Sequence, residues 1–200
     1  MTAGKRICDA LVSLVAIVIL SPVLLCAGTL VWLYDRGPVF FCQERVGRGG
    51  RPFVLRKIRS MQVDSDRDGP PITSAGDRRV TPVGRWLRLL KIDELPQFLN
   101  VLAGEMSLVG PRPEVAQYVS LYSPAQRAVL ELTPGLTDPA SIAYRNEEEV
   151  LARAEDPERY YVEVVMPRKI EMNLEYARNA NIWTDVVILL RTAVAVLKGL

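Results

Sequence analysis

Residues 10–34 form a run of twenty-five residues without a charge, and this run constrains the fold more than any other feature. At about 1.5 Å per residue, a helix of this length reaches roughly 37 Å, enough for a hydrocarbon core of about 30 Å. The run is too long for a signal peptide, and no small-residue cleavage site follows it. A membrane helix is therefore the first interpretation, with a single-pass anchor as its simplest form.

Two features favour a re-entrant helix over a spanning one. Ser21 and Pro22 lie near the middle of the run, and proline removes a backbone donor, so we expect the helix to bend there. Basic residues flank both ends, and positive charge prefers the cytoplasmic side of a membrane. The flanking residues are Lys5, Arg6, Arg36, Arg45, Arg48 and Arg51. Many spanning helices tolerate a proline, so these facts leave both alternatives open.

Charge is segregated along the rest of the chain. Residues 35–91 carry 13 Lys or Arg against 6 Asp or Glu, whereas residues 92–165 carry 5 against 13. A basic block beside a membrane segment suggests anionic partners, which include lipid headgroups, phosphates and nucleic acid. A solvated surface explains the block equally well. The three cysteines show no metal-ligand spacing, which indicates reduced thiols and a cytoplasmic main domain.

The remaining sequence predicts an α+β domain over residues 37–200, mainly helical with a small β-hairpin, after a membrane helix over residues 1–36. The hairpin is expected over 39–46 and 53–59, and a mobile polar loop over 62–80. Thr81 and Pro82 are typical of a helix start. Further helices are expected over 95–103, 123–133 and 147–163, and at the C-terminus, where an apolar periodicity is compatible with an interfacial amphipathic helix.

Asp93 and Glu94 are adjacent carboxylates in a chain without histidine. The simplest interpretation is that Asp93 caps the following helix and Glu94 lies in its first turn. Four cations lie close enough in the sequence to converge on the pair and leave room for a phosphate: Arg88, Arg112, Lys57 and Arg59. Adjacent carboxylates also bind Mg²⁺, and a carboxylate nucleophile needs no histidine. The composition argues against Ser-His and Cys-His enzymes.

Several motifs resemble the bacterial sugar transferases, the small monotopic phosphoglycosyl transferases. They are "KIRSM", "VGRWLRLLKIDELPQFLNVLAGEMSLVGPRPE", "TPGLT" and "RN", in this order, and the block over residues 84–114 is highly specific. The resemblance implies transfer of a phosphosugar from a nucleotide diphosphate sugar, usually a UDP-sugar, to polyprenol phosphate, with release of UMP. It places the reaction at the cytoplasmic face of the bacterial inner membrane and implies a re-entrant helix broken at Ser21 and Pro22.

The resemblance also implies roles for single residues. Asp93 matches the family's nucleophile and Glu94 the acid associated with Mg²⁺, so both are candidate metal ligands. Arg88 and Arg112 match phosphate-binding arginines, and Lys57 matches the lysine before the Arg-Ser-Met motif, which Arg59 opens. Further functional positions are Asp185 and the pair Arg145 and Asn146. Membrane lipid is an expected partner and nucleic acid is not, and a homodimer stays open.

The chain departs from the family pattern at Asp138 and Pro139, where many members have glycine and apolar residues, and at Tyr144, which replaces a usual glycine. These differences leave the donor sugar open. Two other functions remain as alternatives. A glycosyltransferase acting on the same donors would release UDP, although no nucleotide-binding βαβ pattern is visible. A non-enzymatic membrane adaptor would need neither Asp93 nor Arg112.

Overall fold

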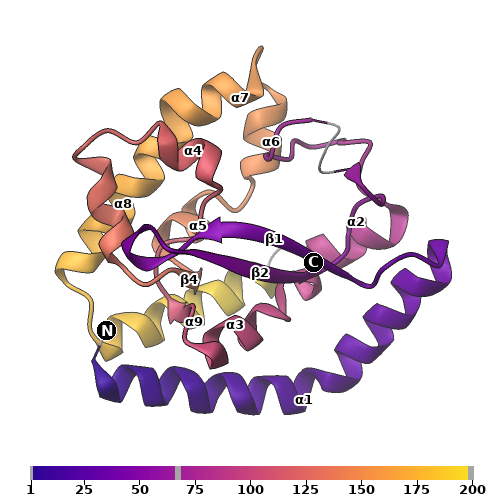
Figure 1. Cartoon of the computed structure of the whole chain (residues 1–200), viewed down its shortest axis with the longest axis horizontal. Coiled ribbons are helices and arrows are strands. Elements are labelled where there is room, and N and C mark those ends of the chain that lie inside the picture. Colours follow the sequence, from indigo (N-terminus) through magenta and orange to yellow (C-terminus); the bar gives the residue numbers. More distant parts are fainter. Residues whose placement is uncertain (1, 66–68, 198–200) are drawn as a thin grey trace.

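The computed structural model describes residues 2–65 and 69–197, and helix α1 (Ala3–Asp35) lies along one side of it (Figure 1). Helix α1 is continuous over 33 residues but bends in its second half. Pro22 lacks the N–H that would bond the carbonyl of Val18, and the Ser21 hydroxyl donates to that carbonyl at 2.8 Å instead. A bend of α1 is confirmed, but the expected break at Ser21 and Pro22 is wrong, because the helix continues through both residues. The serine hydrogen bond explains why the helix continues past the proline.

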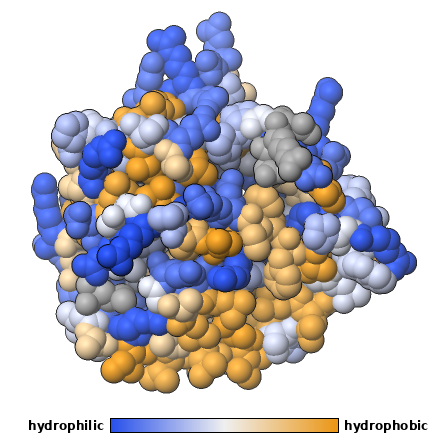
Figure 2. Space-filling model, viewed as in Figure 1, coloured by the Kyte–Doolittle hydropathy of each residue, from blue (hydrophilic) through white to orange (hydrophobic). Residues whose placement is uncertain are grey.

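Most side chains of α1 face outward. Its apolar stretch is long enough and hydrophobic enough to cross a membrane by length and composition. Leu11, Ile19 and Leu25 are each more than half exposed, and Figure 2 shows a continuous apolar surface over the α1 side of the molecule. An exposed apolar face of this extent is typical of a membrane-associated surface.

The first part of the region after α1 is the predicted hairpin. Strands β1 (Phe40–Val46) and β2 (Pro52–Ile58) pair antiparallel, and the glycine-rich turn η1 (Arg48–Gly50) joins them. Helix α2 (Pro82–Leu89) begins as predicted, because the Thr81 hydroxyl accepts from the Gly84 N–H at 2.9 Å. Helix α2 packs on both α1 and the turn η3 (Ile92–Glu94), so the acidic pair is connected to the membrane helix through α2.

Helix α3 (Gln97–Ala103) follows after Pro96, and Gly104 ends it in the left-handed region at φ 86°. A second small sheet was not predicted. In it, β3 (Ser107–Val109) pairs parallel with β4 (Gly135–Thr137). The two segments come close together at Gly110 and Gly135, where a side chain would not fit. A Cβ on Gly135 would lie 2.1 Å from the Gly110 nitrogen.

The C-terminal half is helical, as expected. The segment after Ser123 is a 3₁₀-helix rather than an α-helix, although Ser123 caps it through a 3.3 Å bond from the Gln126 N–H. A buried cluster around Tyr118, Leu151 and Val165 forms the core of this C-terminal half. The elements are α4 (Ala116–Ser120), η4 (Gln126–Glu131), α5 (Pro139–Ala143), α6 (Glu147–Ala152), α7 (Pro157–Tyr160), the π-helix η5 (Tyr161–Val165), α8 (Met166–Arg178) and α9 (Ile182–Leu197).

Helix α9 starts beside the start of α1 and runs in the same direction (Figure 1). Lys5 of α1 forms an ion pair with Asp185 of α9. Arg6 donates to the carbonyls of Val101 and Leu102, at 2.5 and 2.7 Å, and so binds the C-terminal end of α3. Charged contacts therefore hold the start of α1 against α3 and α9.

Candidate functional site

A cavity of about 860 Å³ lies between the hairpin, the η3 turn and the C-terminal helices. One part of its lining is charged and carries Asp93, Glu94 and several cations. Another part is apolar and includes Leu20 of α1, Leu89 of α2 and Val196 of α9. A charged reaction site and an apolar wall that includes the membrane helix therefore share one cavity, which suits a substrate with a charged head and a lipid tail.

Glu94 is held by two cations of the site. Arg112 donates to it in bidentate fashion, with Nη1 3.1 Å from Oε2 and Nη2 2.5 Å from Oε1. Lys57, at the end of β2, places its Nζ 3.5 Å from Oε1. These cations outweigh burial and hold the pKa of Glu94 well below its usual range, so the carboxylate is ionised at neutral pH.

Asp93 is the opposite case. The residue is 2% exposed, and its Oδ1 is buried without a hydrogen-bond partner in the described part of the chain. Burial, with repulsion from Glu94, raises its pKa. The prediction that Asp93 caps the next helix is wrong, because the chain forms a 3₁₀ turn at 92–94 and α3 begins only after Pro96.

Two hydrogen bonds fix the position of the backbone at Arg112. Its N–H donates to Asp138 Oδ2 at 3.1 Å, and the carbonyl of the preceding Pro111 accepts from Gly135 at 2.9 Å. Asp138 is fully buried and also caps α5 through the Ser141 N–H at 2.8 Å. One departure from the family pattern is thus a residue that positions the Arg112 backbone.

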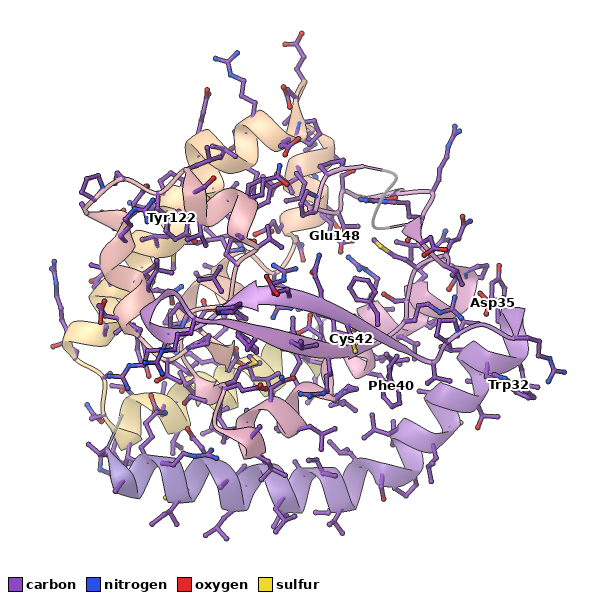
Figure 3. All side chains as sticks on the ribbon, in the orientation of Figure 1. Trp32, Asp35, Phe40, Cys42, Tyr122 and Glu148 are labelled. Carbon is purple, nitrogen blue, oxygen red and sulfur yellow. The ribbon has the colours of Figure 1, made fainter. Side chains whose placement is uncertain are left out.

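Arg88, in the last turn of α2, lines the cavity and forms an ion pair with Glu148 of α6. In Figure 3, Glu148 lies on the side of the hairpin opposite Trp32 and Phe40, which lie toward the end of α1. The structure therefore brings Arg88, Lys57 and Arg112 to one cavity, as predicted for a phosphate site.

Arg59 lies apart from these residues. Its guanidinium donates to both carboxylate oxygens of Asp35 at 2.6 Å and to the Pro38 carbonyl at 2.6 Å. It is 5% exposed and does not line the cavity. The expectation that four cations converge on the acidic pair is therefore wrong for Arg59, which joins the end of α1 to the hairpin instead.

The other predicted positions are spread over the molecule. Arg145 lines the cavity, whereas the neighbouring Asn146 is exposed at the start of α6. Asp185 is buried away from the cavity lining, where it accepts from Lys5 and from the Tyr176 hydroxyl. Asp185 therefore lies where the start of α9 contacts the start of α1.

Several cavity residues were missed from the sequence. Arg45 of β1 forms an ion pair with Glu114 at 3.1 Å, and Glu114 also accepts from the Tyr161 hydroxyl. Lys169 of α8 pairs with Glu147 at 2.7 Å. Glu114 ends the quoted motif over 84–114 and so offered a signal, whereas the lysine on α8 offered none.

The site has two features that suit a divalent cation. Oδ1 of Asp93 has no partner, and Glu94 accepts one hydrogen bond on each oxygen, both from Arg112, which leaves a lone pair on each oxygen. No group of three or more candidate ligand side chains occurs among the described residues. A Mg²⁺ ion here would need further oxygens from substrate phosphates and water, as this ion commonly does.

The family model described as bacterial sugar transferase matches residues 1–199. The chain therefore belongs to the bacterial sugar transferase family. It is 38% identical over 198 residues to a UDP-N-acetylgalactosamine-undecaprenyl-phosphate N-acetylgalactosaminephosphotransferase of Aeromonas hydrophila, across 98% of this chain and 44% of that protein.

Two further relatives are covered more completely. A UDP-glucose:undecaprenyl-phosphate glucose-1-phosphate transferase of Caulobacter vibrioides is 38% identical, over 96% of this chain and 69% of its own length. The exopolysaccharide production protein ExoY of Sinorhizobium fredii is 33% identical, over 96% and 85%. The chain thus spans less than half of the Aeromonas relative but most of the Sinorhizobium one.

Proposed function

We propose that this protein transfers a phosphosugar from a UDP-sugar to a polyprenol phosphate, giving polyprenyl-diphosphate-sugar and UMP. The observation that carries the proposal is Asp93, a buried carboxylate with an unpartnered oxygen beside the cation-bound Glu94. The names of the relatives supply the substrate classes, since they pair UDP-sugars with undecaprenyl phosphate. The cavity, charged at Asp93 and apolar toward α1, matches both substrates.

The first step is a displacement at phosphorus. A carboxylate oxygen of Asp93 attacks the sugar-linked phosphorus of the donor, the bond to the bridging oxygen breaks, and UMP leaves with that oxygen. Arg112 and Lys57 offset the negative charge that two phosphates bring to the site. Burial of Asp93 favours the step further, because a poorly solvated carboxylate has less hydration to lose on attack.

The second step regenerates the enzyme. An oxygen of the polyprenol phosphate attacks the phosphorus held on Asp93, the acyl-phosphate bond breaks, and Asp93 returns as a carboxylate. No proton transfer is needed in either step, because both the nucleophiles and the leaving groups are anions. This explains how a chain without histidine can run the reaction.

Glu94, with Asp93, would hold Mg²⁺ at this site. The ion would supply positive charge to the phosphates of the donor. Glu94 itself keeps Arg112 and Lys57 in place through the contacts described above. Its low pKa keeps the negative charge that all three cations need.

The same proposal includes the membrane arrangement. Helix α1, bent at Pro22, enters the bilayer and returns, so that the cavity opens at the depth of lipid phosphates on the cytoplasmic face of the inner membrane. The support is the exposed apolar face of α1 and the basic residues at both of its ends. Cysteine labelling at residue 3 from outside intact cells tests this, since labelling there would mean a spanning helix.

The decisive experiment is trapping of the covalent intermediate. Incubation with a UDP-sugar and Mg²⁺, without lipid acceptor, should add the mass of a phosphosugar to the peptide that contains Asp93. The matched control is Asp93→Asn, which should carry no adduct and release no UMP. An active enzyme without adduct, or an active Asp93→Asn, would overturn the covalent mechanism.

The identity of the leaving nucleotide separates this function from its alternatives. Assays with UDP-glucose and UDP-N-acetylgalactosamine, scored for UMP and UDP separately, should show UMP with the preferred donor. Release of UDP would indicate a glycosyltransferase. No turnover with any donor, together with normal function of Asp93→Ala and Arg112→Ala variants in cells, would indicate an adaptor.

A further inference from the structure

We propose that Lys91 binds the phosphate of the lipid acceptor and so is a further substrate-binding residue of this site. This inference rests on the proposed function, because it assigns a place to one of the two substrates named there. Lys91 was assigned no role from the sequence, and it lies two residues before Asp93.

The first observation is the charge distribution around Asp93. Lys57 and Arg112 are committed to Glu94, and Arg88 is paired with Glu148. The Lys91 ammonium has no hydrogen bond or ion pair within the described parts of the chain, yet the residue lines the cavity. The lipid phosphate has to approach the phosphosugar held on Asp93, and two anionic phosphate groups repel each other unless a free cation lies near both.

The second observation is the backbone conformation of Lys91. Its φ and ψ are 56° and 21°, in the left-handed region, which is unfavourable for a non-glycine residue. Glycine or asparagine would occupy this position at lower cost. Residues held in such conformations cluster at functional sites, where a specific side chain must be presented.

The third observation separates the two substrates. Lys91 follows Leu89 and Leu90, which line the cavity together with Leu20 of α1. Helix α2 packs on α1, and its Trp86 is 66% exposed. A lysine lays its alkyl chain along apolar groups and presents its ammonium at headgroup level. This position suits a phosphate that arrives on a lipid better than one on a soluble nucleotide.

The kinetic test uses Lys91→Asn and Lys91→Gly, which both accept the left-handed conformation and therefore keep the η3 turn. The KM for polyprenol phosphate should rise about 10- to 100-fold, the loss typical of one charged hydrogen bond, while the KM for the UDP-sugar stays within about twofold. Lys91→Arg should retain most of the affinity. The matched control is Arg85→Asn on helix α2, which precedes Lys91, since Arg85 is exposed and lies outside the cavity lining.

A binding test is independent of turnover. Wild-type protein in detergent micelles should bind farnesyl phosphate more tightly than farnesol in calorimetry, and Lys91→Asn should lose that preference. A retained preference with unchanged KM for the acceptor, or a rise in the KM of the donor instead, would overturn the proposal. The two proposals can fail separately. If the protein turns over no UDP-sugar but still prefers farnesyl phosphate through Lys91, the proposed function is overturned and this inference stands.

Discussion

Two clusters of carboxylates among the described residues each contain a buried aspartate, but their hydrogen bonding differs. Asp9 and Asp185 lie at the joint between α1 and α9, where Lys5 lies 3.8 Å from Asp9 and also pairs with Asp185. Asp9 accepts from the Ser107 hydroxyl at 2.7 Å, and Asp185 accepts from the Tyr176 hydroxyl. In the cavity, Glu94 is similarly satisfied, but Asp93 has an oxygen without a partner.

This difference separates a structural role from a chemical one. A buried carboxylate without partners costs stability, so a fold keeps one only where function requires it. The first cluster connects residues that are 180 positions apart and holds the membrane helix in place. The second leaves one acid unpaired beside a cavity, which is where a nucleophile has to be. Satisfaction of hydrogen bonds, rather than burial, therefore distinguishes Asp93 from Asp185.

The largest expected effect follows from replacing Asp93 by asparagine. Loss of the nucleophile should reduce UMP release by at least about 10⁴-fold. The variant should also be more stable at neutral pH, because it removes a buried charge. We expect a rise in Tm of about 2–4 °C for each kcal/mol gained.

The pH dependence of that stability gain has a definite sign. The pKa of Asp93 is raised in the folded protein, so its ionised form opposes folding above that pKa and its protonated form does not. The Tm advantage of Asp93→Asn over wild type should therefore shrink as pH falls. An active variant, or one less stable than wild type at neutral pH, would contradict the distinction drawn above.

The second prediction concerns the structural cluster. Asp185→Ala leaves Tyr176 without its partner and Lys5 with only Asp9, 3.8 Å away, and we expect a loss of about 2–3 kcal/mol in the free energy of unfolding by urea in detergent. The double variant Lys5→Met/Asp185→Leu should recover a large part of this loss, because it removes both charges. The matched control is Glu163→Ala, which breaks an exposed pair with Arg159 and should cause no measurable change.

Rescue by the double variant also decides the role of Asp185. If Asp185 only positions α1, the rescued protein should regain UMP release together with stability. Recovery of stability without recovery of turnover would instead place Asp185 in the chemistry.

The third prediction tests the bidentate contact between Arg112 and Glu94. Arg112→Lys keeps the charge but cannot donate two parallel bonds, so the KM for the UDP-sugar should rise roughly 10-fold. Steady-state UMP release measures this change. Arg48→Lys is a suitable control, since Arg48 donates one bond to the Glu131 carbonyl outside the cavity. An unchanged KM in Arg112→Lys would mean that charge alone matters at this position.

The sequence predicted the local features of this fold well. The Thr81 cap, the hairpin and the serine that satisfies the backbone at Pro22 all depend on neighbouring residues. The cap assigned to Asp93 failed because Pro96 starts α3 later than the pattern suggested. The charged site was only partly predictable: whether Lys57 or Arg59 reaches Glu94 depends on the direction each side chain takes from the end of β2, and that depends on Asp35.

Most other contacts over long sequence distances could not be predicted. The pairing of β3 with β4 depends on two glycines that let the segments approach, and the anchoring of α1 depends on residues 180 positions apart. The partner of Lys169 likewise comes from a different helix. Sequence periodicity describes which face of an element is buried but not which element covers it.

The smallest expected effect is a change of donor affinity with pH at Lys57. Burial lowers the pKa of Lys57 to about 8, although Glu94 opposes this shift. The ammonium that helps to bind the donor phosphates is therefore present below pH 8 and is lost as the pH rises further. The KM for the UDP-sugar should increase a few-fold between about pH 7 and pH 9 as Lys57 deprotonates. Lys57→Arg keeps its charge throughout this range and should show a flat profile, whereas Lys57→Met should bind weakly at every pH. An alkaline rise in KM that persists in Lys57→Arg would assign the titration to another group.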